Sequence, residues 1–254
     1  MKVKKMLAVF MSVLSLAACI LPFSGCGKTV GKVHNKGVKS GAVRDLTEGI
    51  SKNKSASKAP DKEFKAAAAS FSADLFKYNY SNGKTTLVSP LSVLTALALV
   101  QNGAEGETLA QLERALGGLD RDALNKYMRA YCDFLSAGDE LKIANSVWTD
   151  SSVEAKQAFL QKAVDSYSAQ IFSAPLSSKK TVSSINSWVK KNTDGMIPKI
   201  IENADRDAVM MLINAVAFEA KWETPYTNDD IGKLQFTSYS GTSKKTEYMS
   251  TTDH

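Results

Sequence analysis

Residues 209–222 read V-M-M-L-I-N-A-V-A-F-E-A-K-W, and this stretch decides the fold class. The run from Val209 to Phe218 is apolar apart from Asn214, and such a run is typical of a strand buried on both faces. A buried asparagine must find hydrogen-bond partners, or it costs about 1–3 kcal/mol. The stretch therefore predicts a central strand with one buried amide, and the simplest interpretation of Asn214 is a structural amide that pairs with a loop.

A buried helix is predicted upstream, where residues 89–101 read S-P-L-S-V-L-T-A-L-A-L-V-Q. Ser89 can cap the free N–H groups of the first turn, and Pro90 suits the first helical position. The helix is apolar nearly all round, which predicts burial in the middle of a larger structure. Ser89 and Ser92 thus stand at the head of a buried helix, and capping is the simplest interpretation of Ser89.

Hydrophobic periodicity predicts the remaining elements. Helices are expected at 63–78, 91–101, 108–116, 120–136, 153–170 and 183–191, and strands at 141–148, 209–218, 234–236 and 246–249. Helices come first and strands later, so the predicted fold class is α+β rather than alternating α/β.

The N-terminus has the organisation of a bacterial lipoprotein signal. Three lysines among the first five residues precede an uncharged, apolar stretch over residues 6–23. Both F-S-G-C at 23–26 and L-A-A-C at 16–19 resemble the lipobox, whose cysteine thiol takes a diacylglycerol. Cys26 is preferred because polar residues follow it directly. Cys19 is the alternative, and the L-A-A that precedes it is the better match to the lipobox sequence. A plain secretory signal without lipid also fits, whereas a transmembrane anchor is disfavoured because the apolar run is short and interrupted.

These features divide the chain into three parts. Residues 1–26 are predicted to be the signal peptide with its lipobox cysteine. Residues 27–60, which are rich in Gly, Ser, Lys and Asn and lack aromatics, are predicted to be a flexible basic linker. A compact domain is expected over residues 61–254. The expected location is extracellular, either anchored to the outer face of a bacterial membrane through the lipid or secreted.

The net charge of +6 does not indicate nucleic-acid binding. Eleven of the 32 Lys and Arg residues, but only two of the 26 Asp and Glu residues, lie in residues 1–60. The predicted domain is therefore slightly acidic, with 21 bases against 24 acids, so no nucleic-acid partner is expected. A basic linker beside anionic lipid is the simpler account of the surplus charge.

Residue types needed for catalysis are scarce in the predicted domain. The two histidines are His34, in the linker, and His254, the last residue given, which disfavours a Ser-His-Asp or Cys-His site. No H-E-x-x-H, C-x-x-C or glycine-rich phosphate loop is present, so no metal and no cofactor are expected. Cys132 is predicted to be a small buried hydrophobe. The chain is therefore predicted not to be an enzyme.

Four blocks of sequence, in this order, resemble the serpin family over nearly all of residues 64–253. They are N-G-K-T-T-L-V-S-P-L-S-V-L-T-A-L-A-L-V-Q-N-G-A-E-G-E-T at 82–108, L-K-I-A-N-S-V-W at 141–148, S-I-N-S-W-V-K-K-N-T-D-G-M-I-P-K-I-I at 184–201 and M-L-I-N-A-V-A-F-E-A-K-W at 211–222. The resemblance implies a serpin fold, with helices packed on a large mixed β-sheet, incomplete at the C-terminus. It also implies that Ser89, Ser92 and Asn214 form the "shutter", the polar side chains beneath the point where the sheet parts. Trp222 matches the tryptophan of the "breach", where strand insertion begins.

The resemblance implies a suicide inhibitor of serine or cysteine endopeptidases that acts by loop insertion, with the target protease as its partner. The family's reactive loop follows the matched part, so residues 1–254 alone are expected not to inhibit. Departures at Ala217, 219–221 and 225–226 put the details of sheet packing in doubt, but not the fold. The alternatives are a non-inhibitory serpin-fold binding module, a solute-binding surface lipoprotein, and a truncated, non-functional product.

Overall fold

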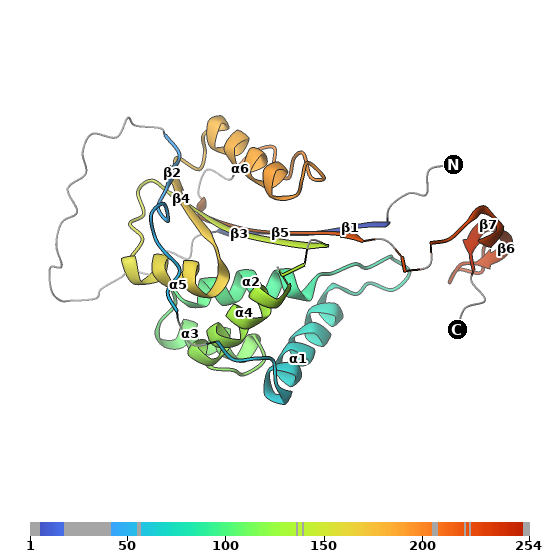
Figure 1. Cartoon of the computed structure of the whole chain (residues 1–254), viewed down its shortest axis with the longest axis horizontal. Helices are drawn as coiled ribbons and strands as arrows, with labels where there is room; N and C mark the ends of the chain where they lie inside the picture. The colour runs from blue at the N-terminus through green and yellow to red at the C-terminus, as the bar shows by residue number, and fades with distance from the viewer. Residues whose placement is uncertain are drawn as a thin grey trace, which may run out of the picture.

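The computed structural model describes residues 42–54, 57–135, 137–138, 140–204, 208–220, 222–223 and 225–250, together with the backbone of residues 6–17. A five-stranded mixed sheet in the order β1-β5-β3-β4-β2 forms its centre, with helices on both faces (Figure 1). A two-stranded antiparallel hairpin, β6–β7, follows the sheet. This is the α+β arrangement that the sequence predicted.

The six helices and the strands β3, β5, β6 and β7 follow the predicted succession, whereas β1, β2 and β4 were not predicted. The strands are β1 (Met6–Ala17), β2 (Arg44–Asp45), β3 (Leu141–Asp150), β4 (Gln170–Ala174), β5 (Ala208–Ala220), β6 (Ile231–Thr237) and β7 (Ser243–Met249). The helices are α1 (Lys62–Asn79), α2 (Pro90–Gln101), α3 (Gly106–Ala115), α4 (Arg121–Leu135), α5 (Gln157–Tyr167) and α6 (Lys179–Asn192). The strand β3 is parallel to β4 and antiparallel to β5, so the sheet is mixed.

The prediction of one helix over residues 153–170 is wrong at its C-terminal end. The helix α5 stops at Tyr167 because Ser168 adopts a left-handed conformation with φ 48°. The N–H groups of Ser168 and Ala169 then donate to main-chain oxygens of the last turn, which closes the helix. Gln170 begins β4, a strand that the sequence analysis did not predict.

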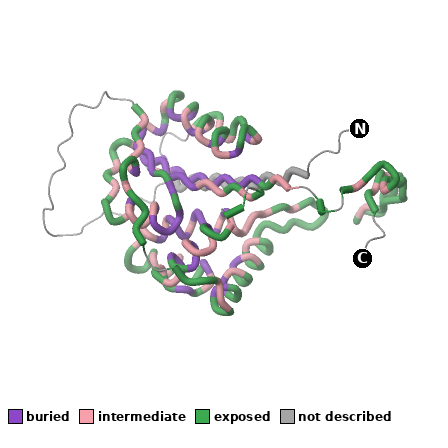
Figure 2. Tube along the Cα trace, in the orientation of Figure 1, coloured by how far each residue is buried: buried purple, intermediate pink, exposed green. Residues whose placement is uncertain are grey.

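Two apolar cores lie on the two faces of the sheet (Figures 1 and 2). The larger core lies between the sheet and α1, α2, α4 and α5; its buried members include Phe64, Phe71, Leu94, Leu99, Tyr127, Met128, Val147, Ile171 and Leu212. The helix α6 covers the other face, over a core that includes Trp148, Phe172, Ile185, Val189, Met211 and Ile213. Because side chains alternate along a strand, β5 contributes to both cores and is buried on both faces from Met211 to Ala217, as predicted.

Residues 43–54 form a strap along the edge of the sheet, although they belong to the predicted flexible linker. Two of them form β2 against β4, and the N–H of Leu46 donates to a main-chain oxygen of β4 at 2.7 Å. The side chains of Leu46 and Ile50 pack against the larger core. These contacts offset the entropy of ordering the segment, so the compact body begins near residue 43 rather than at residue 61.

Asp165 holds the far end of this strap to α5. One carboxylate oxygen accepts from the main-chain N–H of Asn53 at 2.8 Å and from the side chain of Gln161 at 3.0 Å, and the other accepts from the Asn53 side chain at 3.2 Å. Burial acts to raise the pKa of Asp165, but these hydrogen bonds and the charge of Arg129 outweigh it and lower the pKa below its usual value. The ionised carboxylate therefore stabilises the docked strap.

The segment predicted to be the signal peptide supplies the backbone of β1. This strand pairs antiparallel with β5, and its register places Ser12 opposite Asn214. Both lipobox cysteines, Cys19 and Cys26, and residues 27–41 of the predicted linker lie outside the described residues. Within the described part of the chain, no helix has both the length and the apolar character needed to span a membrane.

We expect Leu46→Ala to lower the free energy of unfolding by about 1–2 kcal/mol, because it removes part of the apolar contact between strap and core. Chemical denaturation of the full chain measures this loss. Glu48→Ala is the matched control, since Glu48 is exposed on the same segment. An equal loss in both variants would contradict the packing of the strap.

The stabilisation by Asp165 should be present at neutral pH and disappear in acid. A carboxyl whose pKa is lower in the folded than in the unfolded state stabilises the fold above its unfolded pKa of about 3.9 and loses this contribution as the pH falls through its folded pKa. The difference in unfolding free energy between the unsubstituted chain and Asp165→Asn, on the order of 1 kcal/mol at neutral pH, should therefore shrink in acid. Denaturation of both proteins at about pH 7 and pH 3 tests this, and a difference that persists at the lower pH would refute it.

Candidate functional site

Asn214 lies in the middle of β5 and is 1% exposed. Asn145 of β3 is its direct neighbour in the register. Because side chains alternate along a strand, both asparagines lie on the face of Val147 and Leu212, which belong to the larger core. The side-chain N–H of Asn214 donates to Oδ1 of Asn145 at 2.7 Å. The partner of the predicted buried amide is therefore a second asparagine on the neighbouring strand, and not a loop.

The helix α5 supplies the next member of this polar row. The side-chain N–H of Asn145 donates to the main-chain oxygen of Tyr167 at 2.9 Å. Tyr167 is the last residue of α5, where carbonyl groups have no partner within the helix. At the other end of the row, Oδ1 of Asn214 is buried and has no hydrogen-bond partner among the described residues. An unsatisfied buried acceptor of this kind costs about 1–3 kcal/mol.

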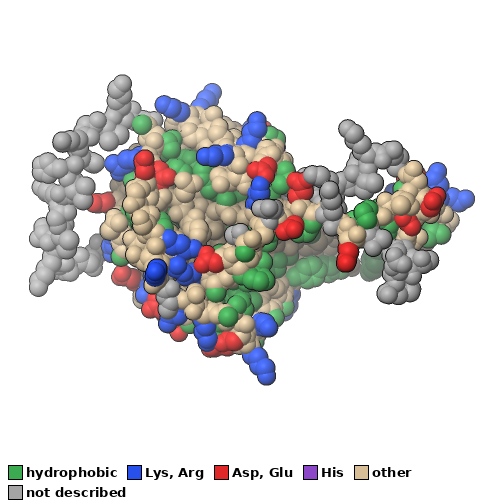
Figure 3. Space-filling model, viewed as in Figure 1, with side chains coloured by type: hydrophobic (Ala, Val, Ile, Leu, Met, Phe, Trp, Pro, Cys, Tyr) green, Lys and Arg blue, Asp and Glu red, His purple; other side chains and the backbone are tan. Residues whose placement is uncertain are grey.

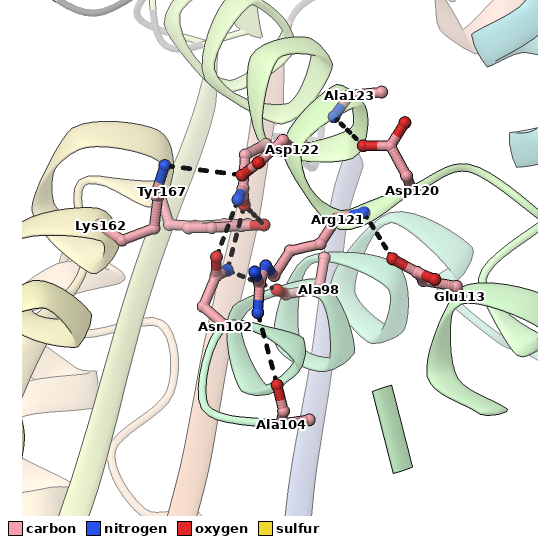
Figure 4. A network of polar contacts seen from close by, with 11 residues as sticks. Ala98, Asn102, Ala104, Glu113, Asp120, Arg121, Asp122, Ala123, Lys162 and Tyr167 are labelled. Atoms are coloured by element: carbon pink, nitrogen blue, oxygen red, sulfur yellow. Dashed lines mark hydrogen bonds and ion pairs between the residues drawn. The ribbon is translucent and has the colours of Figure 1, made fainter. Parts of the chain in front are cut away.

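The side chain of Tyr167 ties the same helix end to α4 and α2 (Figure 4). Its hydroxyl donates to Oδ1 of Asn125 at 2.6 Å, and Asn125 donates to Oδ1 of Asn102 at 2.8 Å. Asn102 in turn donates to the main-chain oxygen of Ala98 at 2.9 Å, in the last turns of α2. Burial raises the pKa of the Tyr167 phenol well above its usual value, so the hydroxyl stays protonated and remains a donor.

The two predicted shutter serines lie together at the head of α2. Ser89 caps the helix, accepting the N–H of Ser92 at 3.4 Å, and its hydroxyl donates to that of Ser92 at 3.0 Å. Ser92 is fully buried. The helix α2 packs against β5, but none of the hydrogen bonds found in the described residues joins either serine to Asn214. The capping role of Ser89 is confirmed, while a shared role of the three residues in sheet opening stays a prediction.

Trp222 lies just beyond the C-terminal end of β5 and is 50% exposed. Its ring meets that of Tyr226 edge to face, with ring centres 5.8 Å apart. Trp222 is therefore a half-exposed side chain at the end of the sheet and is not a member of either apolar core. The breach role that the family resemblance implies for Trp222 stays a prediction.

Cys132 is buried in the larger core, as its sequence context predicted. Burial raises the pKa of its thiol to about 12, so the side chain is an inert hydrophobe rather than a nucleophile. The residues that sequence reasoning missed are Asn145 and Tyr167. An asparagine inside an alternating strand was the available signal for the first, whereas Tyr167 acts through a main-chain atom that its residue type does not reveal.

Comparison with known proteins agrees with this architecture. The sequence model of the serpin (serine protease inhibitor) family matches residues 66–254. Serpin-Z2A of Oryza sativa subsp. japonica is 32% identical over 180 residues, which cover 67% of this chain and 42% of the relative. The leukocyte elastase inhibitor of Bos taurus is 31% identical over 175 residues, which cover 65% of this chain and 46% of the relative. The chain thus spans less than half the length of these two relatives.

Solved structures share the same fold. The thermophilic serpin Tengpin in its native state gives a TM-score of 0.74 at 41% identity, covering 82% of this chain and 54% of that chain. Tengpin in its latent state gives 0.69 at 44% identity, covering 76% of this chain and 54% of that chain. Since the family's sequence model matches most of the chain and solved serpins share its sheet and helices, this chain belongs to the serpin family.

Proposed function

We propose that the protein containing this chain inhibits serine or cysteine endopeptidases by inserting a strand into its main sheet. The observation that carries the proposal is the amide pair of Asn145 and Asn214 at the buried centre of the sheet. A sheet that parts at this point needs hydrogen bonds that can be exchanged, and an apolar core has none to offer. The name of the Bos taurus relative, an inhibitor of leukocyte elastase, supports the inhibitor class.

In the proposed reaction, the target protease attacks a peptide bond of the exposed reactive loop. Its serine or cysteine forms an ester or thioester with the loop carbonyl, and the amine of the broken bond leaves. The loop then enters the main sheet as an added strand and draws the acylated protease with it, so that the enzyme is deformed before water can release it. Residues 1–254 supply the receiving strand β5 and its covering helices. The protein would thus be consumed as an inhibitor and would not act as an enzyme.

We also propose that the protein is held at the outer face of a bacterial membrane by a lipid on Cys26, with Cys19 as the alternative site and secretion as the alternative outcome. The charged start, the uncharged stretch over 6–23 and the F-S-G-C motif support this. The strap begins at residue 43, so a lipid on Cys26 leaves residues 27–42 as the tether. A chain of this length has a typical extension of about 20–25 Å, which would keep the domain close to the membrane. Processing at Cys26 would also remove β1 and free that side of β5 for another strand.

The inhibitor proposal predicts a covalent complex. The product of the complete reading frame that contains residues 1–254, incubated with trypsin-, chymotrypsin-, elastase- and papain-type proteases, should form a 1:1 complex that survives denaturing electrophoresis. Asn214→Leu should raise the share of inhibitor that is cleaved without forming a complex severalfold, because it removes the exchangeable amide. Lys54→Ala, at an exposed strap position, is the control. Cleavage by a protease with no complex would instead support a non-inhibitory serpin-fold module.

The lipid proposal predicts labelling at one cysteine. Cys26→Ser should abolish the incorporation of radioactive palmitate and release the protein from the membrane fraction, whereas Cys19→Ser should leave both unchanged. The opposite pattern would assign the lipid to Cys19. Absence of label in the unsubstituted protein would refute a lipoprotein and leave the plain secretory signal.

A further inference from the structure

The helix α6 has a one-sided charge. Residues 166–193, which include α6, contain four lysines and no Asp or Glu, although residues 61–254 as a whole are slightly acidic. Every other helix that the structure describes either combines its basic residues with at least one acid or, like α2, has neither. A positive patch on a slightly acidic domain attracts partners of negative charge.

The basic side chains lie on the exposed side of α6. Ile185 and Val189 are buried on the other side, in the core that α6 covers. The exposed basic residues, the α6 lysines, are Lys179, Lys180, Lys190 and Lys191. No ion pair joins any of them to an acid in the described part of the chain. In Figure 3, Lys and Arg side chains project from the surface at the top of the view, where α6 lies in Figure 1.

A groove of about 650 Å³ lies between α6 and residues 198–203. Asn186 holds its two walls together, because its Oδ1 accepts from the main-chain N–H of Ile200 at 2.8 Å. The one acid that lines the groove, Glu202, is paired with Lys199 at 2.9 Å. The helix side supplies hydrogen-bond donors from Lys179, Ser183, Ser187 and Lys190. Ammonium and hydroxyl donors of this kind suit the charged oxygens of a phosphate group.

The strap brings the start of the compact body to the same helix. Val43 packs against the core that α6 covers. Gln170 links the strap to α6, since its Oε1 accepts from the ring N–H of Trp188 at 2.7 Å and its side-chain N–H donates to Asp45 at 3.0 Å. The proposed tether over residues 27–42 would therefore join the body beside α6. Its extension of about 20–25 Å is similar to the length of this helix, about 20 Å.

We infer that the exposed face of α6, with the groove beside it, docks on an anionic membrane surface, where the α6 lysines meet phosphate headgroups. The inference rests on the proposed attachment through the N-terminus, because the position of the tether selects a membrane among acidic partners. Each lysine close to an anionic lipid surface adds an attraction that salt screens. Four lysines on one helix would turn the α6 side of the sheet toward the membrane and leave α1 toward solvent.

Energy transfer from two labelled sites to the lipid surface tests this orientation. The full chain with Cys19→Ser and Cys26→Ser carries no lipid, and Cys132 is buried, so a fluorophore can be attached at Ser177→Cys or at Ser70→Cys. Both serines are exposed, the first in the turn before α6 and the second on α1, and these helices lie on opposite faces of the sheet (Figure 1). On phosphatidylglycerol vesicles with a headgroup-linked acceptor, transfer from residue 177 should be about twice that from residue 70 or more. On phosphatidylcholine vesicles, or in about 1 M salt, the two sites should give equal transfer.

The charge of the α6 lysines should cause the difference between the two sites. Gln at all four positions should lower the transfer from residue 177 to that from residue 70, whereas Arg at the same positions should preserve it, because Arg keeps the charge. The matched control removes four exposed charges from α1 and the turn after it, through Lys62→Gln, Lys65→Gln, Lys77→Gln and Lys84→Gln. This control should leave the transfer from residue 177 unchanged.

Absence of binding to phosphatidylglycerol vesicles, equal transfer from the two sites, or full transfer with Gln at the four positions would overturn the inference. Equal transfer from the two sites, together with binding of dextran sulfate that needs the α6 lysines, would assign this face to an acidic polysaccharide instead. The chain in this experiment has no lipid, and palmitate labelling measures the attachment separately. Docking can therefore fail while a lipid is found on Cys26, and the reverse also holds.

Discussion

The hydrogen bond between the side chains of Asn145 and Asn214 is the constraint on which the arrangement of the sheet depends. The strand β5 is buried on both faces, so an amide at its centre cannot reach water and must be satisfied by its neighbours. This demand fixes the register of β3 against β5. A slip by one residue would turn Asn214 toward the apolar core under α6 and leave both amides unpaired. It also requires α5 to end where it does, with the Tyr167 carbonyl free to accept from Asn145.

Most of the fold follows from local patterns in the sequence, because its helices and long strands have unmistakable periodicity. The uninterrupted apolar run predicted β5, and the helix with no polar face predicted that α2 is buried. The strand β4 could not be predicted in the same way. The helix before it is stopped by a left-handed serine, Ser168, where glycine would have been the recognisable signal. The strap was predicted to be linker because only two of its apolar side chains pack against the larger core. Its main chain pairs with the edge of β4, and that strand was itself not predicted.

The candidate site was predictable only where a polar residue interrupts an apolar pattern. Asn214 is the one polar residue in such a run, and Ser89 and Ser92 lie at the start of a helix that has no polar face. Asn145 lies in an alternating strand, where a polar residue is ordinary, and only the register with β5 shows that it faces the core. Tyr167 contributes a main-chain oxygen, and its importance depends on where a helix ends. The roles of these two residues therefore depend on how the strands pair and on where a helix ends, and a linear sequence pattern does not show either.

A row of polar groups at the centre of a sheet is a costly way to build a stable domain, since apolar side chains of similar size would pack there with no unsatisfied atom. What the row adds is direction, because each amide is held in one orientation by the next. The turn that anchors it, residues 165–168, is also where the strap is bound, through Asp165 to Asn53 and through Ser168 to Lys52. The N-terminal strap is therefore tied directly to this turn of helix, and the centre of β5 is tied to it through Asn145 of β3. The strap and the polar row thus share one anchor, the last turn of α5, which the strap reaches through the side chains of Asp165 and Ser168 and the row through the main-chain oxygen of Tyr167.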